Sequence, residues 1–204
     1  MVKINILESD REIQKRINKA LAKQVTLTMN SAAKDIYRNL RPIVRRAIAS
    51  SPAIDSLRSG TMRADFGLTK DPTGLIIESV ADSIQVRPRE VKFSGSKAVT
   101  GIDIFIQPSS FSNLLSLPVA EQAIKNGSIP WLKWLLTLGD AVIIADFGIQ
   151  YGPFGRTGEA RMTRKYAPFR VNSRYSGTSD NNFISKALAK FSTEIKQVIV
   201  KALQ

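Results

Sequence analysis

The sequence has neither cysteine nor histidine among its 204 residues. These absences exclude zinc clusters built on thiolate and imidazole, thiol nucleophiles, serine triads with a histidine base, and imidazole proton shuttles. Catalysis would have to use carboxylates, lysine, tyrosine, serine or a bound Mg²⁺. The lack of cysteine also fits a reducing compartment. The chain therefore carries little catalytic equipment.

A long unbroken apolar run is also missing. The strongest run, IPWLKWLLTLGDAVIIADFGI, is interrupted by Lys133, Gly139, Asp140 and Asp146, whereas a membrane span needs about 20 predominantly apolar residues. The N-terminal MVKINILESD has too short an apolar core for a secretory signal. We therefore expect a soluble protein with no membrane partner.

Acidic residues are scarce relative to basic ones. Asp and Glu total 17 against 30 Lys and Arg, which gives a formal net charge of +13. Such a surplus favours a polyanionic neighbour, which is nucleic acid, an acidic protein surface or anionic lipid. One basic cluster lies in residues 1–50, and the other contains the candidate DNA-facing or partner-facing residues Arg156, Arg161, Arg164 and Lys165. No zinc finger, RNP pattern or helix-turn-helix accompanies them, so any DNA contact would be independent of base sequence.

The first fifty residues predict a long amphipathic helix. Ser9 and Glu12 match the S-x-x-E capping box. Apolar residues follow at helical spacing, beginning with Ile13, Ile17 and Leu21. Pro42 disfavours helical geometry at the residue before it, so we expect a kink or break there and a continuation to about Ala49.

The predicted helix is too long for the body of its own domain. From Ser9 to Arg41 it would reach about 50 Å at 1.5 Å per residue. A compact domain of this size has a radius of gyration of about 17 Å. Part of the helix should therefore project, and Ile13, Ile17 and Leu21 become candidate residues of a subunit interface.

The rest of the chain predicts an α+β domain, with the long N-terminal helix and a C-terminal helix packed on one face of a small, mostly antiparallel sheet. A single domain of residues 1–204 is expected, with a helical region 1–49, a sheet with loops and a short helix in 50–178, and a C-terminal helix in 179–204. Within it we expect a turn-rich segment at 50–60, strands at 75–86 and 99–108, a basic hairpin or loop at 87–97, a short helix at 130–139 and a buried strand at 141–149.

Two tryptophans share one face of the predicted short helix. Trp131 and Trp134 are three residues apart, so both can bury a large area on the same side. Core packing is the favoured interpretation. A subunit contact and stacking on nucleic-acid bases are the alternatives.

The stretch GPFGRTGEARM, residues 152–162, has the glycine content of a phosphate-binding loop but not its spacing. A Walker loop aligned on Gly155 would need a glycine where the chain has Gln150, and a lysine where it has Arg156. The glycines instead indicate a sharply turning loop.

An enzymatic alternative uses three charged residues. Asp82 followed by Glu90 and Lys92 echoes the carboxylate and E-x-K pattern that Mg²⁺-dependent nucleases place on neighbouring strands. Two carboxylates would hold the metal, and the lysine would stabilise developing negative charge. The competing interpretation is an exposed charged hairpin, since Pro88 interrupts the expected strand.

Motifs at both ends resemble a known family. The amphipathic N-terminal helix followed by SPAIDSLRSG, and DNNFISKALAKF at the start of the last helix, are similar to the tail-completion and head-tail joining (neck) proteins of tailed bacteriophages. GRTGEARM together with FRVNSRYSGTSDNNFISKAL also resembles virion structural proteins of large tailed phages. Residues 66–130 are not matched. Ile54-Asp55 and Asn181-Asn182 depart from the threonine-glycine and proline common in the family.

The resemblance implies a non-enzymatic virion structural protein that forms a homo-oligomeric ring at the head-tail junction. Its neighbours would be connector, portal or tail-tube proteins, with non-specific contact to packaged DNA and assembly in the host cytoplasm. It implies no cofactor, no metal and no catalytic residue. In this setting Arg156 and Arg161 would reach a partner subunit or the DNA passage.

Overall fold

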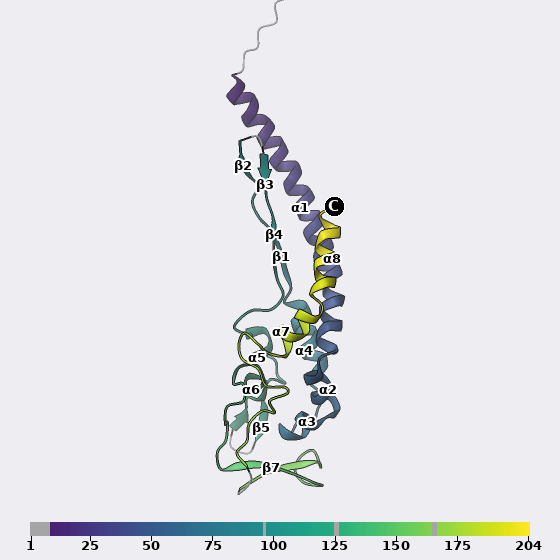
Figure 1. Cartoon of the computed structure of the whole chain (residues 1–204), viewed down its shortest axis with the longest axis vertical. Helices are drawn as coiled ribbons and strands as arrows, with labels where there is room; N and C mark the ends of the chain where they lie inside the picture. The colour runs from purple at the N-terminus through teal and green to yellow at the C-terminus, as the bar shows by residue number, and fades with distance from the viewer. Residues whose placement is uncertain (1–8, 96, 125–126, 165–166) are drawn as a thin grey trace, which may run out of the picture.

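The computed structural model describes residues 9–95, 97–124, 127–164 and 167–204. The molecule is elongated, because one long helix extends beyond a body of short helices and β-hairpins (Figure 1). The helices are α1 (Asp10–Ala49), α2 (Pro52–Ser59), α3 (Thr61–Asp65), α4 (Thr73–Asp82), α5 (Ser112–Leu115), α6 (Trp131–Thr137), α7 (Phe183–Lys190) and α8 (Ser192–Ala202). The strands are β1 (Gln85–Pro88), β2 (Lys92–Ser94), β3 (Lys97–Val99), β4 (Ile102–Phe105), β5 (Gln122–Ile124), β6 (Gly127–Ile129), β7 (Phe147–Tyr151) and β8 (Ala160–Arg164).

The predicted α+β class and the antiparallel strand pairing are confirmed. In the part of the chain that the structure describes, the strands form four separate two-stranded sheets, β1-β4, β2-β3, β5-β6 and β7-β8, instead of one larger sheet. Two-stranded sheets bury little on their own. The core is therefore built mainly by helices, and the hairpins pack around it.

The predicted capping box at the start of α1 is present. The Ser9 backbone N–H and its hydroxyl both donate to the Glu12 carboxylate over 2.9 Å, and the Ser9 Oγ accepts from the Glu12 N–H. The hydrogen bonds from Ser9 hold the pKa of Glu12 below its usual value. These contacts satisfy N–H groups that have no partner within the helix.

The expected break before Pro42 is absent, because α1 continues through it to Ala49. Proline removes one backbone hydrogen bond and crowds the preceding turn. Leu40 and Val44 flank it and are completely buried, as are Ala47 and Ile48 in the next turn. Packing on both sides of the proline therefore compensates for the local cost.

The core lies in the body, at the C-terminal end of α1. Helices α2, α4, α7 and α8 all contact α1, and α6 contributes apolar side chains to the same cluster. Its largest fully buried members are Trp131, Ile36, Leu40, Ile48, Ile54, Leu57, Met62, Ile76, Leu114, Leu132, Leu135 and Leu136. Of the described helices, none has both the length and the apolar character of a membrane span.

Two predicted segments have a different secondary structure. The predicted strand at 75–86 is mostly helix α4, followed by the beginning of β1. Within α4, Ile76 and Val80 are buried at four-residue spacing, which fits a helical face better than a strand. The predicted turn at 50–60 is mostly helix α2, which begins at Pro52, the position where proline favours a helix start.

The predicted buried strand at 141–149 is wrong over most of its length. Only β7, from Phe147, is a strand, and Ile144 makes an isolated bridge to Phe169. Val142 is 47% exposed.

Other elements agree better with the predictions from the sequence. Strand β4 lies within the strand expected at 99–108, and β2 and β3 form the expected basic hairpin. Helix α6 lies within the expected short helix, and the expected C-terminal helix is present but divided at Phe191.

Candidate interaction surface

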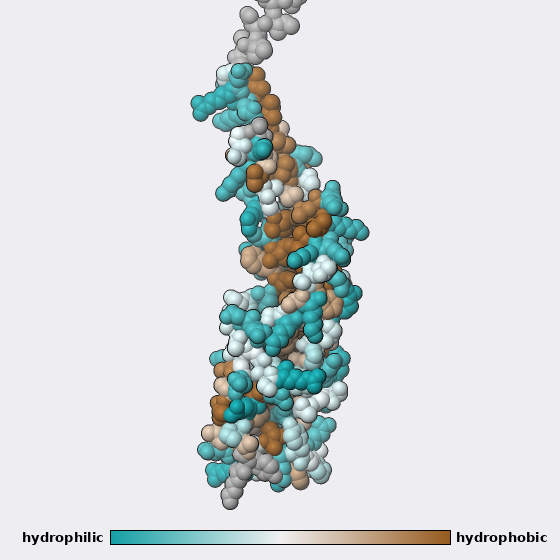
Figure 2. Space-filling model, viewed as in Figure 1, coloured by the Kyte–Doolittle hydropathy of each residue, from teal (hydrophilic) through white to brown (hydrophobic). Residues whose placement is uncertain are grey.

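The N-terminal half of α1 projects from the body and carries uncovered apolar side chains. From Asp10 to Ser31 no residue of the helix is buried, and the first buried one is Ala32. Ile17 is 53% and Leu27 57% exposed, and Leu21 is also exposed. Figure 2 shows apolar surface along this part of the helix. The predicted interface residues Ile13, Ile17 and Leu21 therefore lie on the free part of α1, with Ile13 half-buried.

The apolar surface continues where other elements meet α1. Strands β1 and β3 lie against one side of the helix and α8 lies against another (Figure 1). A groove of about 450 Å³ between α1 and β1 is lined by Ala33, Tyr37 and Val86, among others. A second groove of about 420 Å³ lies between α1 and α8 and is lined by residues of both helices. Exposed large apolar residues are Tyr37 on α1, Val99 on β3 and Val200 on α8, together with Phe105 on β4 and Leu203 directly after α8. Exposed apolar side chains that gather on neighbouring elements are typical of a protein-protein contact.

The free half of α1 is also basic. The positive side chains are Arg11, Lys15, Arg16, Lys19 and Lys23, against the negative Asp10 and Glu12. The helix therefore presents apolar residues beside an excess of positive charge. A partner surface with exposed apolar residues and carboxylates would complement it.

The opposite end of the molecule has such a surface. The segment between α6 and β7 exposes Leu138 and Val142 together with the carboxylates of Asp140 and Asp146. Helix α6 and strand β7, which flank this segment, lie in the lower body in Figure 1, far from the free end of α1. We name this segment, residues 138–146, the acidic loop.

The two tryptophans face the interior. Trp131 is completely buried, its indole N–H donates to the Val119 carbonyl over 2.8 Å, and its ring lies 5.4 Å from that of Phe66. Trp134 is half-buried, with its ring centroid 6.1 Å from that of Phe169. Core packing, favoured from the sequence, is confirmed for Trp131. The alternative of a subunit contact is wrong for Trp131, since it has no exposed surface to offer.

The glycine-rich stretch connects β7 to β8 at the lower end of the molecule (Figure 1). Its candidate basic residues are exposed but contact their own chain. Arg156 donates to the Ala123 carbonyl of β5 over 2.6 Å, and Arg161 stacks on Phe154 and donates to the Gln150 side chain. Arg164 lies over the Phe147 ring. Lys165 lies outside the described residues. A DNA or partner contact by these residues stays a prediction.

One hydrogen bond ties this hairpin to the helical body. The Tyr151 hydroxyl on β7 donates to the Asp65 carboxylate at the end of α3 over 2.5 Å. Burial raises the pKa of Asp65, and the hydrogen bond from Tyr151 partly opposes that shift. Burial and the hydrogen bond to Asp65 raise the pKa of Tyr151. The tyrosine thus keeps its proton and remains the donor at neutral pH.

Within the hairpin, Gly155 and Gly158 make a matched pair for mutation. Both have a left-handed backbone, with φ of 72° and 74°. A Cβ at Gly155 would lie 2.0 Å from the Ala160 carbonyl oxygen, whereas a Cβ at Gly158 would meet nothing within 4 Å. Gly158→Ala is therefore expected to cost about 1 kcal/mol from backbone strain alone.

Gly155→Ala should cost clearly more, because the Ala160 backbone of β8 must also move. Thermal unfolding of both variants, read by circular dichroism, measures the difference. Equal melting temperatures would contradict the contact between residues 155 and 160.

The three residues of the nuclease alternative do not have the predicted placement. Asp82 is the last residue of helix α4, and its carboxylate pairs with Arg41 of α1. Glu90 follows β1, and Lys92 begins β2. The prediction that they lie on neighbouring strands is wrong. Among the residues that the structure describes, no group of three or more acidic side chains is close enough to hold a metal ion.

Sequence reasoning missed two parts of this surface. Leu27 lies off the stripe of Ile13, Ile17 and Leu21, and it is 57% exposed although Val25 and Met29 beside it are half-buried. For the acidic loop the sequence predicts a buried strand, because the apolar run AVII between Asp140 and Asp146 is typical of one. Comparison of the chain with models of protein families, with curated proteins and with solved structures finds no match.

Proposed function

We propose that this chain is a non-enzymatic structural subunit that assembles with copies of itself into a closed ring. The observation that carries the proposal is the free half of α1, where Ile17, Leu21 and Leu27 are exposed on a helix that the body does not cover. Removing apolar area from water contributes about 25 cal/mol per Å². A neighbouring subunit is the simplest source of that coverage.

The charges favour contact between different surfaces of two copies. Two basic helices would repel each other, whereas the basic helix of one copy and the acidic loop of the next attract. In this contact the exposed apolar side chains of Ile17 and Leu21 on the helix pack against Leu138 and Val142 on the acidic loop. A contact between unlike surfaces is heterologous, and it produces a ring when the rotation between copies closes.

The place of this ring is proposed from the resemblance. Motifs at both ends of the chain and in the glycine loop are similar to neck and tail-completion proteins of tailed bacteriophages. The proposed location is therefore the head-tail junction of a virion, between connector or portal proteins and the tail. The net charge of +13 suits a ring whose lumen faces packaged DNA.

Electron microscopy of the purified protein, combined with its mass from light scattering, tests the proposal. We expect closed rings of one size and a mass that is an integral multiple of 22.5 kDa. The rings should be more populated at low salt than at high salt, because the proposed contact pairs opposite charges. A protein that stays monomeric at high concentration and low salt would overturn the self-assembly.

A further inference from the structure

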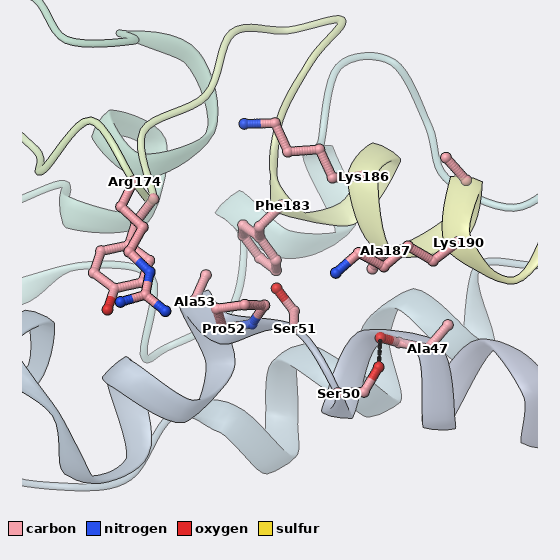
Figure 3. Close-up of a pocket in the computed structure, with 12 residues that line it drawn as sticks. Ala47, Ser50, Ser51, Pro52, Ala53, Arg174, Phe183, Lys186, Ala187 and Lys190 are labelled. Carbon is pink, nitrogen blue, oxygen red and sulfur yellow. Dashed lines mark hydrogen bonds between the residues drawn. The ribbon is translucent and has the colours of Figure 1, made fainter.

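A pocket in the body lies between the end of α1, the start of α2 and helix α7. Its volume is about 400 Å³. Its walls are mainly apolar and come from Ala47, Pro52, Ala53, Phe183 and Ala187. Figure 3 shows Phe183 facing Pro52 and Ser51 across it. These residues come from parts of the sequence more than a hundred positions apart, and the projecting half of α1 takes no part in the pocket.

A hydroxyl without a partner lies on the floor of the pocket. Ser51 is only 5% exposed, and its side chain forms no cap to α2. Among the described residues nothing hydrogen-bonds its Oγ, although its backbone N–H donates to Ile48. In Figure 3 the Oγ points into the pocket, whereas the neighbouring Ser50 Oγ donates to the Ala47 carbonyl over 2.9 Å. The Ser51 Oγ opens onto the pocket, so it is available to donate a hydrogen bond to a ligand there.

The start of α2 adds further donors beside Ser51. The first N–H groups of a helix have no acceptor within it, and the helix dipole favours negative charge there. Pro52 has no N–H, so Ala53, which lines the pocket, is the first residue able to donate. The Ser51 hydroxyl and this helix end thus present donors to the same space.

Three positive side chains surround the same space. Arg174 approaches it from the loop before α7, and Lys186 and Lys190 extend from α7 (Figure 3). None of the three forms an ion pair with a carboxylate in the described part of the chain. The Arg174 guanidinium group lies over the ring of Tyr175, 5.6 Å from its centroid. The pocket therefore combines a positive, donor-rich side with an apolar side.

We propose that this pocket binds a phosphate monoester carried on a flat apolar group. A phosphate offers three terminal oxygens and close to two negative charges, which matches the Ser51 hydroxyl, the start of α2 and the three cations. A planar guanidinium such as that of Arg174 can bind two of those oxygens at once. The apolar body of the ligand lies against the ring of Phe183 and the apolar side chains of Ala47, Pro52 and Ala187.

Calorimetric titration of the full-length protein with phenyl phosphate tests the assignment. We expect saturable binding with one site per chain, and weaker binding of inorganic phosphate, which lacks the apolar body. Benzoate, which keeps the ring but has a singly charged planar head, should also bind more weakly. Equal or tighter binding of inorganic phosphate or benzoate, or no saturable binding of phenyl phosphate, would overturn the proposal.

Variants locate the site. Lys190→Gln and Arg174→Gln each remove one charge-assisted contact and should weaken phenyl phosphate binding by about tenfold or more. Ser51→Ala removes only the hydroxyl and should weaken it less. The control is Lys196→Gln, an exposed lysine on α8 that does not line the pocket.

Circular dichroism verifies that each variant is folded before titration. If the pocket variants bind phenyl phosphate as well as the Lys196→Gln control does, the ligand lies elsewhere and the proposal is wrong. Because none of these residues belongs to the projecting half of α1 or to the acidic loop, the result is independent of ring formation.

Discussion

Replacing Ile17 and Leu21 together with glutamine is expected to convert the assembled ring into free subunits. Both side chains are exposed on the part of α1 that the body leaves uncovered. Each contributes about 1.5–3 kcal/mol when removed from water in an interface. The dissociation constant of each contact should therefore rise by roughly a hundredfold or more. Sedimentation velocity over a range of concentrations measures this change.

The matched control is the double variant Lys19→Gln and Lys23→Gln. It introduces the same two residues into the same stretch of helix, and glutamine is a good helix former at all four positions. The two lysines point away from the apolar stripe, since helical positions two residues away lie on a different face. The control should still form rings, although with weaker attraction to the acidic loop.

One outcome of this experiment would contradict the proposed self-contact. If the Ile17 and Leu21 variant assembles as well as the unmodified protein, the projecting helix is not the self-contact, and the proposed function loses its main support. Both double variants should keep the melting temperature of the subunit, because neither pair contributes to the buried core. A large loss of stability would instead show that the helix is covered within its own chain.

The sequence predicted best what depends on neighbours along the chain. The capping box at Ser9 and Glu12 is local and is present in the structure. The excess length of α1 followed from simple geometry, and so did the exposure of Ile17 and Leu21. The helix around Trp131 was marked by Pro130 before it and Gly139 after it. In each case the signal lies within one turn or one element.

The wrong predictions of secondary structure occur where one sequence pattern fits both a helix and another structure. Segment 75–86 is rich in β-branched residues, which favour a strand. In the structure Ile76 and Val80 are instead buried on one face of helix α4. Pro52 was read as part of a turn, although proline is equally suited to the first position of a helix. Pairing with distant segments decides such cases, and a single sequence does not show that pairing.

The two candidate sites also differ in how far each can be recognised from the sequence. The apolar stripe of α1 is visible in sequence because it repeats within one helix. The phosphate pocket is not, because it brings Ser51 together with Arg174 and Lys190, which lie far along the chain. Its one local signal is the serine before Pro52, and that serine could only be interpreted once its side chain was seen to lack a partner.

Trp131→Ala is expected to cause the largest loss of subunit stability. The side chain is completely buried, contacts the Phe66 ring and donates a hydrogen bond to the Val119 carbonyl. Removing a buried tryptophan costs about 3–5 kcal/mol. For a chain of this length that corresponds to a fall in melting temperature of about 10 °C. Trp134→Ala should cost less, since Trp134 is half-buried. Differential scanning calorimetry compares the two.

The same variant separates the core from the interface. Trp131 has no exposed surface, so it stabilises the subunit without touching a neighbouring copy. Below its lowered melting temperature, Trp131→Ala should therefore still form rings of unchanged size. The Ile17 and Leu21 variant should do the reverse, keeping its subunit stability and losing the ring. If Trp131→Ala instead abolished assembly while the chain stayed folded, the core and the interface would be coupled through α6, whose C-terminal end leads directly into the acidic loop at Leu138.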